Sequence, residues 1–288
     1  MLWRKKQAKP GEKDLIQPAD LTAPVAAEIL GSKLESMIEA MDDQGGLDRF
    51  LDALRTKQDL FVQGLDAERL KTLTPAALDA LVETVFSARR KLPAVLSRLG
   101  HENTVEAIRE LLYGDGPVRE RLQAFTAVLP LDEPQDKAQQ KAVAKLRRAG
   151  WDLGAELLHF RDMERYPLMS RWVWDASTES GAMREYVRGG DTMRELPFDD
   201  RPETYEGFRV WVTEQLAESG FYRDVPMFVD LLLAWAYSDY MQAMSSHIGI
   251  IEAEFGGKND PTELLQKILG IDPARRHGQS RLNKETVH

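Results

Sequence analysis

Apolar residues recur three or four positions apart along almost the whole chain, which is the spacing of one face of an α-helix. Helix start signals accompany these runs. Thr74 precedes Pro75 as an expected N-cap, and Asn103 with Glu106 has the spacing of a capping box. No run that alternates apolar and polar residues is long enough to predict a strand. The sequence therefore predicts an all-α fold, a multi-helix bundle.

Residues 131–144 separate two kinds of helical sequence. They contain few apolar groups, which fits either a polar linker or the exposed start of a long helix. We therefore expect two helical subdomains joined by a long helix. The expected divisions are a flexible basic N-terminal tail at 1–19, an N-terminal subdomain of short helices at 20–130, the linker or helix start at 131–144, an aromatic- and Arg-rich helical domain at 145–256, and a short capped helix with a loose C-terminal tail at 257–288.

Residues 225–237 form the most apolar segment, with apolar side chains on nearly every face of the predicted helix. A helix with so little polar surface is expected at the centre of its domain. The segment is well short of the roughly 20 residues that cross a bilayer, which predicts no stable membrane insertion. Asp230 and Asp239 need partners, because a carboxylate on an apolar face is costly to leave alone. Arginines of the preceding segments are the expected partners.

Charge and targeting signals favour a cytoplasmic protein that does not bind nucleic acid. The chain has 38 Lys and Arg against 47 Asp and Glu, a net charge of −9, whereas nucleic-acid binding requires cations that displace counterions. The basic residues at 1–6 are not followed by the apolar region of a signal peptide.

The chain lacks the residues and motifs of common catalytic and metal sites. Without Cys there is no disulfide, thiolate metal site or cysteine nucleophile. The Glu-x-x-His pattern of helical di-metal proteins occurs once, at Glu156 and His159, whereas those proteins need two such patterns. No phosphate-binding loop, nucleophile elbow or kinase motif is present. We expect no metal site and no cofactor, and assign no catalytic residue.

Aromatic and cationic residues are distributed unevenly. Most of the aromatic residues lie between Trp151 and Phe255, and from Leu146 to Gly257 every cationic residue other than histidine is an arginine. Arginine suits bidentate, stacked or partly buried contacts better than lysine does. The pattern fits either internal ion pairs or a concave site for a carboxylate, a phosphate or an acidic partner segment.

The densest cluster of such residues predicts a ligand-binding site. Arg171 and Asp175 lie four apart, so they would pair across one turn of a helix. The neighbouring tryptophans are costly to leave in water, so the segment is expected to be buried in the core or to contact a ligand. The candidate ligand-binding residues are Arg165, Arg171, Trp172, Trp174, Asp175, Trp235 and Asp239.

Two functions are compatible with these patterns. The first is a cytoplasmic helical interaction protein, such as an adaptor, an assembly factor or a regulatory subunit, with a protein partner. It is favoured by the helical sequence without a catalytic motif. The alternative is a domain that binds an anion or small molecule, with or without an enzymatic activity, through the Arg and Trp residues of 145–256.

Overall fold

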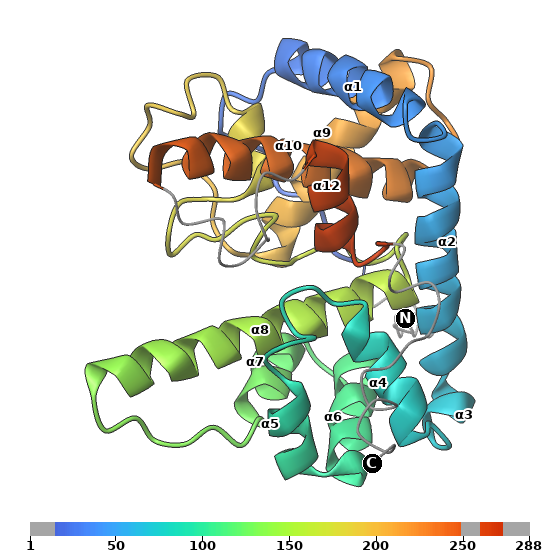
Figure 1. Cartoon of the computed structure of the whole chain (residues 1–288), viewed down its shortest axis with the longest axis vertical. Helices are drawn as coiled ribbons and strands as arrows, with labels where there is room; N and C mark the ends of the chain where they lie inside the picture. The colour runs from blue at the N-terminus through green and yellow to red at the C-terminus, as the bar shows by residue number, and fades with distance from the viewer. Residues whose placement is uncertain (1–14, 249–259, 273–288) are drawn as a thin grey trace, which may run out of the picture.

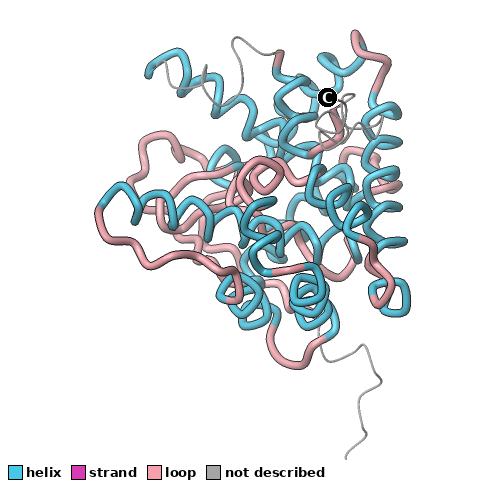
Figure 2. The backbone as a smooth tube through the Cα atoms, turned by 60° about the horizontal axis from the view of Figure 1, so that its bottom comes forward, coloured by secondary structure: helices cyan, strands magenta, loops and turns pink. Residues whose placement is uncertain are grey.

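A computed structural model describes residues 15–248 and 260–272, and it confirms the all-α prediction. Within these ranges the backbone forms helices and loops without a strand, as Figure 2 shows. The helices are α1 (Ala27–Asp42), α2 (Leu47–Gly64), α3 (Ala67–Leu70), α4 (Pro75–Glu83), α5 (Pro93–Leu99), α6 (His101–Tyr113), α7 (Val118–Ala127), α8 (Lys137–Arg161), the 3₁₀ helix η2 (Ala182–Tyr186), α9 (Pro202–Glu218), α10 (Val225–Ile248) and α12 (Pro261–Leu269).

The helices form two groups, with α8 lying between them (Figure 1). One group contains α3 to α7, and the other contains α1, α9, α10 and α12. Helix α2 runs along one side of both groups and contacts α4 and α8 as well as α10. Helix α8 is 25 residues long, and it begins at Lys137, within the segment for which the sequence allowed a linker or a helix start.

Helix α10 is the centre of the second group, as its apolar sequence predicts. Its side chains from Met227 to Ala236 are buried, and the helix contacts α1, α2, α9, η2 and α12. Helix α1 packs here, although the sequence placed it in the N-terminal subdomain. Residues 20–130 therefore do not pack only among themselves.

The helix start signals differ in how well they predict the true start. Thr74 caps α4 as predicted, because its hydroxyl accepts a hydrogen bond from the amide of Ala77 at 3.2 Å. The capping box expected at Asn103 is wrong. Helix α6 already begins at His101, and the Asn103 side chain donates to the carbonyl of Leu99 at 2.8 Å.

Helix α7 packs closely against α8 because α8 carries two glycines on the contact face. A Cβ atom at Gly154 would lie only 3.0 Å from carbon atoms of Leu122 and Phe125, and one at Gly150 would overlap Leu129. Any larger residue would push the helices apart or force the α7 side chains to move. These glycines fix the position of α7 relative to α8.

The first described residues are held by backbone hydrogen bonds to α9 and η2. The amide of Ala19 donates to the carbonyl of Glu203 at 2.8 Å, and the amide of Ala26 donates to the carbonyl of Tyr186 at 2.9 Å. Residues 15–19, placed by the sequence in a flexible tail, are therefore attached to the fold at Ala19. Residues 1–14 of that tail, residues 249–259 and the tail at 273–288 lie outside the described residues.

The C-terminal helix α12 is capped at its start by Asp260, whose carboxylate accepts from the amide of Thr262 at 2.8 Å. It ends at Gly270, which has a left-handed φ of 67°. A Cβ atom here would overlap the carbonyl of Thr84, so glycine is required for both conformation and space. No helix in the described ranges meets the length and hydropathy needed to span a membrane.

Candidate functional site

Arg171 and Asp175 form the ion pair that their spacing predicts, although they lie in a loop rather than on a helix. Asp175 also accepts hydrogen bonds from the amide of Ser177 at 3.1 Å and from its hydroxyl at 2.6 Å. Burial alone would raise the pKa of Asp175, but the bonds from Ser177 and the charge of Arg171 outweigh it, so the pKa is lowered. This carboxylate is ionised and already satisfied within the chain.

The two tryptophans beside this pair contact other aromatic residues. The Trp174 side chain is buried and packs edge-to-face on Phe198, with ring centroids 5.5 Å apart. Trp172 packs on Tyr237 of α10, with centroids 5.9 Å apart. The segment therefore attaches the loop after α8 to the helices of the second group.

The predicted residues on α10 contact α1. The indole nitrogen of Trp235 donates to the hydroxyl of Ser36 at 3.0 Å. Asp239 pairs with the ammonium of Lys33 at 3.1 Å. The expectation that Asp239 pairs with an arginine of a preceding segment is therefore wrong, because the cation comes from the distant helix α1.

The seven predicted residues lie in several parts of the second group rather than around one cavity. Arg165 packs over the ring of Tyr166, with its guanidinium carbon 5.3 Å from the ring centroid. None of the seven lines the three cavities described below. Their role in binding an anion stays a prediction.

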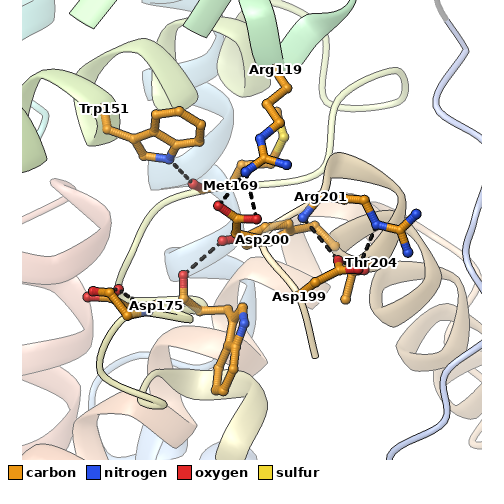
Figure 3. Close-up of polar contacts among 11 residues, drawn as sticks. Arg119, Trp151, Met169, Asp175, Asp199, Asp200, Arg201 and Thr204 are labelled. Carbon is orange, nitrogen blue, oxygen red and sulfur yellow. Dashed lines mark hydrogen bonds and ion pairs between the residues drawn. The ribbon is translucent and has the colours of Figure 1, made fainter. Parts of the chain in front are cut away.

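The loop after α8 also connects the two helix groups, as Figure 3 shows. Arg119 of α7 pairs with Asp200 at 2.7 Å, immediately before α9. Trp151 of α8 donates from its indole nitrogen to the carbonyl of Met169 at 3.0 Å. The next residue of α8, Asp152, accepts from the amide of Arg171 at 2.8 Å. Burial raises the pKa of Asp152 to about 6, against the lowering effect of that amide and of the Arg171 charge.

A buried ion pair joins α2 to α8. The ammonium of Lys57 lies 2.6 Å from the carboxylate of Glu156, and both side chains are buried. Lys57 also donates to the carbonyls of Leu269 at 2.7 Å and Thr84 at 3.2 Å, and lies 4.0 Å from the ring centroid of Phe160. Burial lowers the pKa of Lys57 and raises that of Glu156, while their mutual attraction opposes both shifts.

Lys57 is not among the predicted site residues, but the sequence contains a signal for it. Lys57 lies four residues before Phe61 and three after Leu54, on the face of α2 that also carries Phe50. A lysine on that face is an exception to the apolar pattern of the helix. Such an exception predicts a buried cation with a carboxylate partner.

Asp230, for which an arginine partner was expected, is paired with His159 instead. The Nε2 atom of His159 lies 2.8 Å from Oδ2 of Asp230, and its Nδ1 atom lies 2.8 Å from the carbonyl of Tyr166. A carbonyl only accepts, so Nδ1 carries a proton and both ring nitrogens are engaged. The cavity beside this pair has a volume of about 10 Å³, which holds about one water molecule and no substrate.

Two larger cavities open on the surface. The one near the start of α10 has a volume of about 530 Å³. Two of the charged residues that line it are paired within the chain, since Arg209 pairs with Glu206 at 2.7 Å and Asp224 pairs with Arg55 at 2.6 Å. Its lining mixes these charged residues with apolar ones, among them the exposed Tyr222.

The other cavity is an open groove of about 660 Å³ between α5, α6 and α7, which we call the acidic groove. Its floor is apolar and its rim carries carboxylates. The apolar residues that line it are Leu99, Ala107, Leu111, Ala124, Phe125 and Val128. The carboxylates that line it are Glu106, Glu110, Asp115 and Glu120.

The charges of the acidic groove are only partly balanced. Arg109 pairs with both Glu106 and Glu110, with 2.8 Å between its Nε and a Glu106 oxygen. Asp115 and Glu120 have no ion-pair partner in the part of the chain that the structure describes. The groove could not be predicted from the sequence, because its shape depends on how the three helices pack.

No cluster of three or more residues of the types that ligate metals is close enough to hold an ion in residues 15–248 and 260–272. The chain matches no protein-family model, no curated protein and no solved structure in the comparisons made with them.

Proposed function

We propose that the protein is a cytoplasmic helical interaction protein, an adaptor, assembly factor or regulatory subunit, that binds a helix of a partner protein in the acidic groove. The observation that carries this proposal is the apolar floor of the groove, which is open to solvent between α6 and α7. Apolar grooves between helices are a common binding site for an amphipathic helix of a partner.

The size of the groove suits a helix. Helix α6, which forms one wall, has 13 residues and so runs about 20 Å, long enough to contact three to four turns of a partner helix. Ala124 and Val128 lie one turn apart on the opposite wall, and both are exposed. Small and branched apolar residues at this spacing leave room for the side chains of a helix lying between the walls.

The proposal is tested with the full chain and a fluorescein-labelled synthetic helix of 16 residues, which has leucines at helical spacing and glutamines elsewhere. We expect saturable binding by fluorescence anisotropy. Ala124→Arg fills the groove with a charged side chain and should abolish binding. Ala127→Arg is the matched control, because Ala127 is exposed on the same helix and does not line the groove.

Two results would contradict the proposal. One is that the helix fails to bind, whether its polar face is neutral, cationic or anionic. The other is that Ala124→Arg and Ala127→Arg change the affinity equally, which would place binding outside the groove.

A further inference from the structure

We infer that the partner helix is cationic and amphipathic, and that Glu106, Glu110, Asp115 and Glu120 recognise its positive charges. This inference rests on the proposed function and adds the chemistry of the partner. It is carried by the placement of carboxylates around an apolar floor, together with the small number of cations available to neutralise them.

The carboxylates are placed on both walls and at one end of the groove. Glu106 and Glu110 lie one turn apart on α6, so both project on the same side of that helix. Glu120 lies on α7, and Asp115 lies in the turn that joins the two helices. All four are exposed. A helix lying on the floor would therefore have a carboxylate beside each edge of its polar face.

The cations near the groove leave it a net negative charge. Four carboxylates line the groove, whereas two guanidinium groups lie near them: Arg121 lines the groove, and Arg109 pairs with two of the glutamates. Arg121 is 6% exposed and donates to the carbonyls of Leu111 at 2.7 Å and Leu112 at 3.2 Å, so its charge is directed toward the end of α6.

Arg121 provides a second indication of an occupant. It lines the groove, and its Nε and Nη2 atoms have no hydrogen-bond partner among the described residues. Buried donors are nearly always satisfied in folded proteins. A carbonyl oxygen at the end of an occupant helix would satisfy them once the groups that cover these atoms move aside, as the last carbonyls of α6 satisfy Nη1.

Charge complementarity of this kind selects a partner more strongly than it increases affinity. A cationic helix gains attraction at the rim and keeps its apolar contacts with the floor. An anionic helix with the same apolar face meets four carboxylates at close range. The groove should therefore separate helices of equal hydrophobicity by the sign of their charge.

The test uses three labelled helices of 16 residues that share their leucine positions and differ only in the polar face, which carries Lys, Gln or Glu. With the full chain in low salt we expect the Lys helix to bind about tenfold more tightly than the Gln helix, and the Glu helix to bind most weakly. Raising the salt concentration should weaken the binding of the Lys helix and leave the binding of the Gln helix unchanged, because salt screens the attraction between charged groups.

The variant Glu106→Gln/Glu120→Gln should bring the affinity for the Lys helix close to that for the Gln helix. Glu102→Gln is the matched control, since Glu102 is exposed on α6 and does not line the groove. Equal binding of the Lys and Gln helices to the unmodified chain would overturn the inference and leave the proposed function intact. Failure of all three helices to bind would overturn both.

Two further outcomes would assign the groove to a different occupant. If Arg4→Gln/Lys5→Gln/Lys6→Gln strengthens binding of the Lys helix, the N-terminal residues of this chain compete for the groove. If the unmodified chain dimerises by sedimentation and Ala124→Arg restores the monomer, the occupant is a second copy. Either result would overturn the assignment to another protein.

Discussion

The Arg-rich residues 145–256 and the acidic groove both concentrate charge, but they use it differently. In the first region the described pairs lie within the chain: Arg171 binds Asp175, and Arg209 binds Glu206 and the carbonyl of Met163. In the groove, Asp115 and Glu120 have no such partner in residues 15–248 and 260–272, and they remain in solvent. The seven site residues predicted from the enrichment in arginine and tryptophan line none of the three cavities, whereas Asp115 and Glu120 lie at the rim of one.

The largest expected effect comes from the buried charge between the two helix groups. Lys57→Met leaves Glu156 as a buried carboxylate without its cation, and we expect the free energy of unfolding to fall by about 3 to 5 kcal/mol. Lys57→Met/Glu156→Leu removes both charges and should recover at least half of that loss. Urea unfolding followed by circular dichroism measures the free energy of unfolding of both variants. If the free energy of unfolding of Lys57→Met lies within about 1 kcal/mol of that of the unmodified chain, the ion pair is not structurally important.

An effect of intermediate size is expected from Asp152, whose pKa is raised by burial to about 6. The unfolded chain has a pKa near 3.9, so the folded state binds the proton more tightly. Stability should therefore fall as pH rises from about 4 to 6 and stay level above that. The total decrease due to this group is about 3 kcal/mol.

Asp152→Asn tests this dependence, because asparagine still accepts from the amide of Arg171 and carries no charge. We expect the variant to be more stable than the unmodified chain at pH 7 and equally stable at pH 3.5. Urea unfolding across this range gives the difference. Asp59→Asn serves as control, because Asp59 is exposed on α2 and forms no ion pair in the described residues. A difference in stability between Asp152→Asn and the unmodified chain that does not grow between pH 4 and 6 would contradict the assignment.

The smallest expected effect on stability is at the acidic groove. Glu106→Gln/Glu120→Gln should leave the free energy of unfolding nearly unchanged, because exposed ion pairs contribute little. The same variant should lose selectivity for the cationic helix. Thermal unfolding is the measurement, and a large loss of stability would show that the rim carboxylates hold the fold rather than a partner.

The fold class could be predicted from the sequence because helical spacing and end signals are local. The apolar segment 225–237 predicted a central helix, and Thr74 predicted the start of α4. Asn103 failed as a start signal because α6 already begins at His101, directly after α5, and Asn103 lies inside the helix. The spacing of a capping box also occurs inside helices.

The partners of buried charges and the acidic groove could not be predicted in the same way. Asp230 and Asp239 clearly needed partners, but which cation or histidine reaches them depends on how α1, α8 and α10 cross. The groove depends on contacts between α5, α6 and α7 and on the glycines that bring α7 onto α8. Those are properties of tertiary packing rather than of any one segment.

The bond from Lys57 to the carbonyl of Leu269 joins residues 212 positions apart in the chain. During synthesis the N-terminal helices emerge first, yet this ammonium cannot complete its set of acceptors until α12 has left the ribosome. Contacts of such long range slow folding and prolong the exposure of apolar surface. A translational stall before Pro261 should therefore leave Lys57 without this acceptor and leave uncovered the part of α10 that α12 contacts.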